Sequence, residues 1–156
     1  MGLFSQMRDW LRGDRRGARD LLADLVGDYR VEVEAAAHLR AHAEQAPYRQ
    51  ARETLLRLAD AEDQHAALLR KLIDTLGATV PDVAPTIPSG LNHWGRMADA
   101  FERADEKRRR LLEQSIHWDV DHPEIAAALA RLAREETGNR RLLEELVTRA
   151  DSLALD

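Results

Sequence analysis

Two pairs of polar residues lie in the middle of long apolar stripes, where they could carry chemistry. The first pair is Glu62 and His65, and the second, 74 residues further along the chain, is Glu136 and Asn139. The flanking apolar residues recur at steps of three and four, which places each stripe and its polar pair on one face of a helix. A carboxylate on such a face is costly to bury without a partner. A metal ion is one partner that would stabilise it.

Size and composition favour a single all-helical domain. The chain has 156 residues, in which Ala, Leu, Arg and Glu dominate. The absence of cysteine excludes disulfides, rubredoxin-type iron centres and thiolate-held clusters. The formal charge of −5 is modest and spread along the chain, so we expect no nucleic-acid partner. No apolar run approaches the ~20 residues of a membrane span. With no signal peptide evident, these features predict a cytoplasmic protein that does not associate with a membrane.

Turn signals divide the chain into an N-terminal amphipathic segment, residues 1–13, and a helical bundle, residues 14–156. The bundle is predicted to contain four helices, at about residues 15–46, 48–76, 92–117 and 121–152. The signals at the helix ends are Pro47, Gly77, the cap residue Asn92, Pro123, and the capping-box pair Asp121 and Glu124.

The lengths of the connections predict how the helices are arranged. The first and third turns are short, so each joins two helices into an antiparallel hairpin. The proline-containing connector between the hairpins has about 15 residues. At ~3.3 Å per residue it can travel the full length of a helix that is ~45 Å long. We therefore predict an all-α, up-down-down-up four-helix bundle with one long crossover between its second and third helices.

Antiparallel pairing in the first hairpin sets which residues share a height. If the first turn centres on Pro47, Glu62 lies level with Glu32. Glu32 is then predicted to face inward, with Glu34 as the alternative pointing toward solvent. The predicted inward row of the first helix is Leu21, Leu25, Asp28, Glu32 and Leu39.

The same counting applies to the second hairpin. If its turn centres near Val120, Glu136 lies level with Asp105, which is the predicted interior carboxylate of the third helix. Glu102 and Glu106 lie further round that helix and remain alternatives. The predicted inward row is Trp94, Met97, Ala98, Phe101, Asp105, Arg108, Leu112 and Ile116.

The residues predicted to meet at mid-height could form a metal centre. Several carboxylates can bridge two divalent cations ~3.5–4 Å apart, and imidazole suits iron, manganese or zinc. Tyr29 falls near the level of His65, where it could donate a hydrogen bond or take part in redox chemistry. Arg108 could instead pair with the carboxylates and replace a missing cation. The predicted metal ligands are Glu32, Glu62, His65, Asp105, Glu136 and Asn139.

Over about residues 15–152 these motifs resemble the ferritin-like superfamily, and most of all its rubrerythrin-type branch. The family pattern is a Glu on the first helix, E-x-x-H on the second, a Glu on the third and E-x-x-H on the fourth. The segment AEDQHAALL supplies Glu62 and His65, and Glu32 is the best match on the first helix. The chain departs from the pattern at Asn139, where a second His is expected, and at Asp105, where a Glu is expected.

The resemblance implies iron as the cofactor, with manganese or zinc as alternatives, and oxidation of Fe(II) or reduction of peroxide as the activity. Electrons would come from a separate donor protein or from Fe(II) itself. Because the amide of Asn139 is neutral, an asymmetric two-metal site, a one-metal site and no metal site all remain open. The alternative function is a catalytically inactive structural or interaction bundle with a metal-free polar core. We expect a homodimer formed through exposed helix faces.

Two other groups of ionisable residues are interpreted as ordinary surface residues. Glu34, His38 and His42 have metal-ligand spacing, but their helix face is polar, so we expect them to be solvated. The basic run 107–110 points in four directions around a helix, so we expect it to be solvated as well.

Overall fold

Four long helices and one extended connector make up the described part of the chain. The structure, a computed structural model, describes residues 15–150, so the segment predicted at residues 1–13 lies outside the described residues. The helices are α2 (Arg15–Glu44), α3 (Arg49–Thr75), α4 (His93–Trp118) and α5 (Pro123–Arg149). No strand occurs between residues 15 and 150, which confirms the all-α class.

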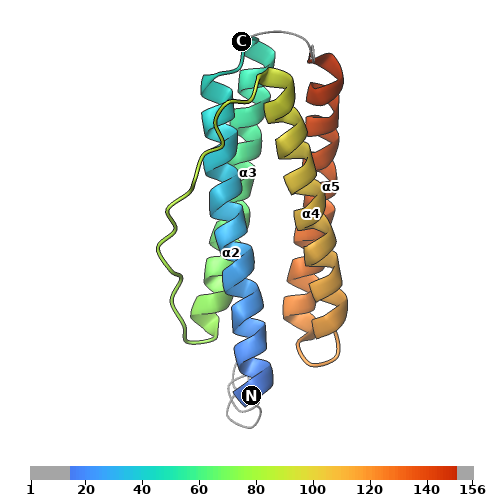
Figure 1. The fold of residues 1–156 in the computed structure, drawn as a ribbon. Coiled ribbons are helices and arrows are strands. Elements are labelled where there is room, and N and C mark those ends of the chain that lie inside the picture. Colours follow the sequence, from blue (N-terminus) through green and yellow to red (C-terminus); the bar gives the residue numbers. More distant parts are fainter. Residues whose placement is uncertain (1–14, 151–156) are drawn as a thin grey trace.

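The helices follow the predicted up-down-down-up order (Figure 1). α2 and α3 pack closely as one antiparallel hairpin, and α4 and α5 pack as the other. Across the bundle α2 faces α4 and α3 faces α5, with sparser contacts. The connector runs outside the helices along the length of the bundle and carries the chain back to the end at which α2 finishes. The predicted long crossover is therefore confirmed.

Most of the predicted helix ends match the structure. The Oδ1 atom of Asn92 accepts a hydrogen bond from the backbone N–H of Gly95 at 2.8 Å, as an N-cap does. Gly77 follows α3 with φ +79°, a left-handed conformation that glycine adopts without strain. The predicted capping box of Asp121 is wrong. The N-cap of α5 is His122, so Asp121 lies one residue too early to cap the helix.

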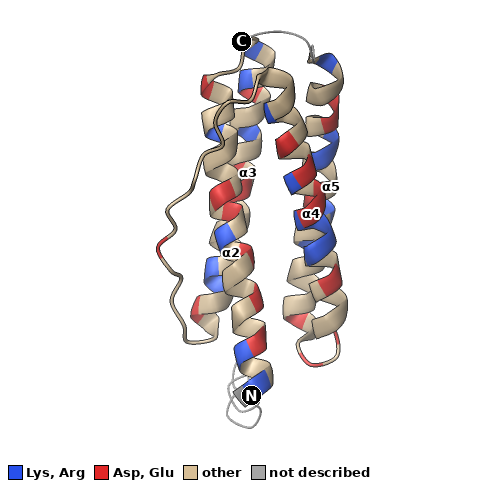
Figure 2. Cartoon of the chain, viewed as in Figure 1, with Lys and Arg blue, Asp and Glu red and all other residues tan. Residues whose placement is uncertain are grey.

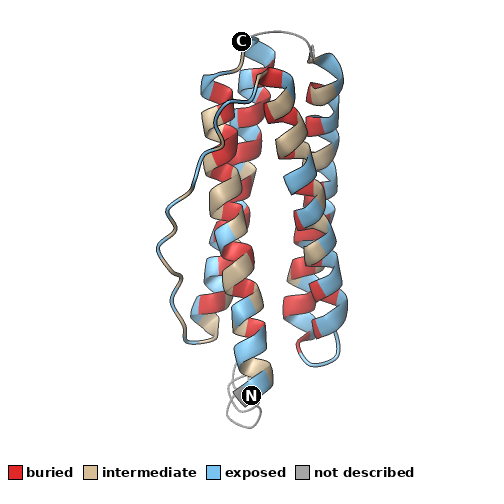
Figure 3. Ribbon diagram, viewed as in Figure 1, coloured by how far each residue is buried: buried red, intermediate tan, exposed pale blue. Residues whose placement is uncertain are grey.

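The orientation of α4 about its axis differs from the prediction by about one residue. The buried row contains Met97, Ala104, Lys107 and Leu111. In the predicted row, by contrast, Ile116 is 70% exposed. Figure 3 shows the buried positions facing the interior of the bundle. A hydrophobicity pattern favours the neighbouring face because the true inner row includes a lysine and small alanines. Trp94 and Leu112 of the predicted row are likewise exposed.

The core consists of two apolar layers with a charged layer between them. Along α2, Glu32 falls between the buried Leu25 and Leu39, which belong to different layers. Each fully buried leucine contributes roughly 1.5–3 kcal/mol relative to an exposed one. One layer includes Leu21, Leu25, Leu69, Ile73, Leu111, Ile125 and Leu129, and the other includes Leu39, Leu55, Leu58, Met97, Leu143 and Leu146.

Charged residues are spread over all four helices (Figure 2). None of the helices in the described range 15–150 has the length and apolar character that a membrane span requires.

Candidate metal centre

Side chains from all four helices meet in the charged layer. α2 supplies Glu32, α3 supplies Glu62 and His65, and α5 supplies Glu136; all four are buried, and Glu32 and Glu136 have no exposed surface. One ligand atom from each of these four residues lies within 4.8 Å of the others. The structure thus brings together four of the six residues that the sequence predicted as metal ligands.

The remaining helix, α4, contributes a cation to this layer. The Nζ atom of Lys107 lies 2.8 Å from Oε2 of Glu32 and 3.0 Å from Oε1 of Glu136, and it donates a hydrogen bond to Glu62. Burial alone would lower the pKa of Lys107, but the three surrounding carboxylates outweigh burial and raise it. Lys107 is therefore held as an ammonium ion.

The sequence pattern does not identify Lys107, because this residue begins a basic run of the kind that usually lies on a solvated surface. Two signals could have identified it. Lys107 lies three residues after Ala104 and four before Leu111, which is the spacing of a helix face. It is also one of only two lysines, with Lys71, among 23 basic residues.

His65 is positioned by a carboxylate on each side of its ring. Its Nε2 atom lies 2.9 Å from Oε2 of Glu135, and its Nδ1 atom lies 3.1 Å from Oε1 of Glu136. A carboxylate behind a histidine fixes the ring orientation and is common around metal-binding histidines. Burial alone would lower the pKa of His65, but the nearby carboxyl groups of Glu136, Glu32 and Glu62 outweigh burial and raise it to about 12. In the absence of a metal ion, the imidazole is therefore protonated.

The pKa values of two neighbouring buried carboxyl groups are shifted in opposite directions. Burial raises the pKa of Glu32 and outweighs the nearby ammonium of Lys107. For Glu62, interactions with Glu32, His65 and the ammonium of Lys107 outweigh burial and bring the pKa well below its usual range. The positive charges of Lys107 and His65 lie among the carboxyl groups of Glu32, Glu62 and Glu136. These two cations therefore offset much of the negative charge of the layer.

The donor set fits one divalent ion better than two. Three carboxylates and one imidazole are ligands that iron, manganese and zinc accept. Within the described residues, Oε1 of Glu32 and Oε2 of Glu136 are buried and have no hydrogen-bond partner, so these oxygens have unused acceptor capacity. A second ion would bring the metal charge to four, whereas α4 contributes an ammonium in place of a carboxylate. We conclude that the residues present suit a single ion.

The interior position predicted for Asp105 is wrong. Its carboxylate is only partly buried and faces α5, where Oδ1 is 2.9 Å from Nε of Arg140; it is also 3.3 Å from Nη2 of Arg108. The rotation of α4 relative to the predicted row explains this displacement. It also places Arg108 outside the centre, so the cation that pairs with the central carboxylates is Lys107 and not Arg108.

Asn139 lies at the edge of the centre as a hydrogen-bond donor. Its Nδ2 atom is 3.4 Å from Oε1 of Glu136 and 3.5 Å from Oε1 of Glu62. Since both neighbours are carboxylates, the amide presents its NH₂ group to them, and its oxygen does not point toward the shared ligand position. Its predicted role as a metal ligand is untested.

Tyr29 is buried, and its hydroxyl oxygen accepts a hydrogen bond from Nη2 of Arg70 at 2.9 Å. Its redox role stays a prediction. Among the alternatives considered for the ligands, Glu102 and Glu106 are exposed, and Glu34 is half-buried.

The interpretation of His38 and His42 as solvated residues is wrong. His42 has no exposed surface, and His38 is buried, with its Nε2 atom 2.7 Å from the carbonyl oxygen of Thr86 in the connector. Burial lowers the pKa of His42 to about 4. The connector covers part of this face, and the sequence did not reveal this contact.

The fold is that of a known class of protein. No family model matches the sequence, and no curated protein matches it either. A crystal structure of ferritin-like, diiron-carboxylate proteins from Bacillus anthracis str. Ames is similar, with a TM-score of 0.73 and 19% sequence identity over 85% of this chain and 98% of that chain. The chain therefore has the ferritin-like four-helix fold, and its interior holds a group of residues that could bind a metal ion.

Proposed function

We propose that this protein binds one divalent transition-metal ion through Glu32, Glu62, His65 and Glu136, and that the ion is iron. The observation that carries the proposal is the convergence of four ligand atoms, from three helices, in a buried layer. The diiron-carboxylate description of the similar crystal structure supports iron over manganese or zinc.

The protein residues have separate tasks in this proposal. The three carboxylates offset the charge of the ion, Glu135 holds the His65 ring in place, and the apolar layers above and below exclude water. A bound iron(II) ion would supply one electron to an oxidant such as oxygen or peroxide and would thereby be oxidised to iron(III). Because the donor set suits one ion, we favour one-electron oxidation of Fe(II) over a two-electron peroxide reduction. A homodimer and an external electron donor stay predictions.

Anaerobic equilibrium dialysis of untagged protein against Fe(II), followed by metal analysis, tests the proposal. We expect one ion per chain. Glu136→Gln should weaken binding roughly tenfold or more, because it removes a charged ligand, whereas Glu144→Gln on the exposed face of α5 should leave binding unchanged. Metal content well below one ion per chain in the wild-type protein, or equal binding by the two variants, would contradict it.

One observation favours a second candidate function. Lys107 and the protonated His65 already compensate the buried carboxylates, as a metal-free structural or interaction bundle would require. The same dialysis separates the two candidates, since the bundle without a metal function should bind no stoichiometric ion.

A further inference from the structure

A cavity of about 200 Å³ lies between α2 and α4, beside the charged layer. Glu62 and Lys107 are among its buried lining residues, so the cavity reaches the centre itself. Its apolar walls include Leu39, Ala100 and Leu143. Its more exposed lining residues are Glu34, Arg103, Glu106 and Arg110.

At the mouth of this cavity, the two arginines form ion pairs within the described residues, whereas the two glutamates do not. Arg103 forms an ion pair with Asp99 at 2.8 Å, and Arg110 forms one with Asp28 at 2.9 Å. In the part of the chain that the structure describes, neither Glu34 nor Glu106 forms an ion pair. The uncompensated charge at the mouth is therefore negative, and a mouth of this sign raises the local concentration of cations.

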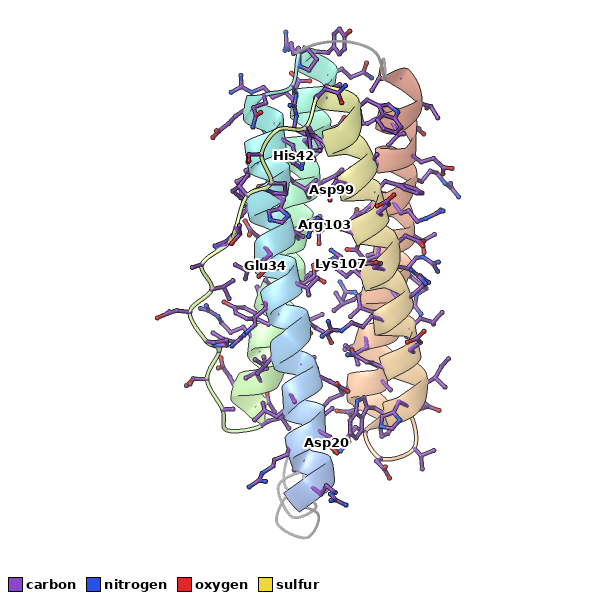
Figure 4. All side chains as sticks on the ribbon, in the orientation of Figure 1. Asp20, Glu34, His42, Asp99, Arg103 and Lys107 are labelled. Carbon is purple, nitrogen blue, oxygen red and sulfur yellow. The ribbon has the colours of Figure 1, made fainter. Side chains whose placement is uncertain are left out.

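Lys107 and a metal ion compete for one position. The ammonium lies against the three carboxylates that would hold the ion, and two cations there would repel each other. A lysine has a flexible four-carbon stem, so its ammonium can move without a change in the helix. Figure 4 shows Lys107 of α4 and Glu34 of α2 at a similar height on helices that flank the cavity.

We propose that this cavity is the route by which a divalent metal ion reaches the centre, and that Lys107 is a displaceable plug at its inner end. When the ion arrives, the ammonium withdraws into the cavity toward Glu34 and Glu106. The inference rests on the proposed function, because it requires that an ion binds.

The lysine content of the chain makes this displacement measurable. Lys71 and Lys107 are the only lysines in the sequence, and Lys71 is exposed on α3. A short pulse of an amine-acylating reagent, followed by mass spectrometry, reports the accessibility of each lysine separately. Lys71 serves as the internal control.

The wild-type protein is labelled with and without Co(II), whose binding is followed by its visible absorption. Without Co(II), Lys71 should be acylated and Lys107 protected. With saturating Co(II), acylation of Lys107 should rise at least several-fold while that of Lys71 stays constant. Stoichiometric Co(II) binding with Lys107 still protected would overturn the plug while leaving the proposed function intact.

Variants at both ends of the cavity provide a second measurement. Lys107→Met should bind Co(II) at least tenfold more tightly, since no ammonium competes.

The double variant Glu34→Gln, Glu106→Gln should bind Co(II) several-fold more slowly than Glu102→Gln, a control on the exposed face of α4. Unchanged rates in the double variant would overturn the route. If neither the wild-type protein nor Lys107→Met binds Co(II), the proposed function itself fails, and the inference fails with it.

Discussion

The two helical hairpins supply unequal halves of the centre. The α2–α3 hairpin provides Glu32, Glu62 and His65, each of which can bind a metal ion directly. The α4–α5 hairpin provides one such residue, Glu136, together with the ammonium of Lys107 and the amide of Asn139. The fold is shared by both halves, but only the first half has a full set of anionic and imidazole ligands. If the proposed function holds, the second hairpin therefore limits the number of ions that the protein can bind.

Making the second hairpin resemble the first should have the largest effect. In the double variant Lys107→Glu, Asn139→His, a fourth carboxylate and a second imidazole enter the layer, and the loss of the ammonium allows a higher metal charge. We expect metal analysis after anaerobic Fe(II) loading to rise from one ion per chain to two. Lys71→Glu, a charge reversal on the exposed face of α3, is the control and should still bind one ion. A double variant that binds a single ion would contradict the explanation.

A second test of this hairpin concerns which face of α4 is buried. Leu111 is 1% exposed and Leu112 is 44% exposed, although they are adjacent in the chain. Leu111→Ala should lower the free energy of unfolding by roughly 2–5 kcal/mol, and Leu112→Ala by no more than about 0.5 kcal/mol. Denaturant titration of both variants measures the difference. A larger loss of stability in Leu112→Ala than in Leu111→Ala would instead support the inward row that the sequence pattern predicted.

The first hairpin has a pH-dependent element that lies apart from the centre. The folded protein holds His42 neutral down to about pH 4, whereas the unfolded chain binds a proton there below about pH 6.5. Since the unfolded state binds more protons in this range, stability falls as pH is lowered from 6.5 to 4, by roughly 3 kcal/mol. Denaturant titrations at several pH values should show that His42→Leu removes this part of the loss. The exposed His117→Gln should retain it, and identical pH profiles for both variants would argue against burial of His42.

A smaller effect is expected at the contact that joins the hairpins through His65. Glu135 of α5 lies 2.9 Å from the His65 ring on α3 and is half-exposed, so its replacement should not disturb the core. Glu135→Gln should weaken metal binding about 10–100-fold, because the ring loses its charged orienting partner. Isothermal titration with Co(II) measures this loss, and thermal denaturation of the metal-free protein should change little. A large drop in thermal stability instead would assign Glu135 a structural role.

The sequence predicted the architecture because the signals for it are local. Pro47 and Gly77 mark helix ends, and the length of the connector admits one crossover. Counting residues from the first turn then placed Glu32 level with Glu62, which the structure shows side by side. These features depend on chain geometry and do not require knowledge of packing.

The remaining features depend on contacts between helices, which no local pattern contains. The inner row of α4 includes Lys107, and its small alanines give a weak apolar signal, so the sequence pattern favours the neighbouring row with Asp105. The burial of His38 similarly depends on its contact with Thr86 in the connector, 48 residues away. In both cases a polar side chain can be buried because groups distant in the sequence form a hydrogen bond or an ion pair with it.

The most direct test of the central claim is an anomalous difference map from crystals of the protein loaded with Co(II), recorded at the cobalt absorption edge. The account predicts one peak per chain in coordination contact with Glu32, Glu62, His65 and Glu136. A map without such a peak, in which Lys107 still lies among the three glutamates, would contradict it.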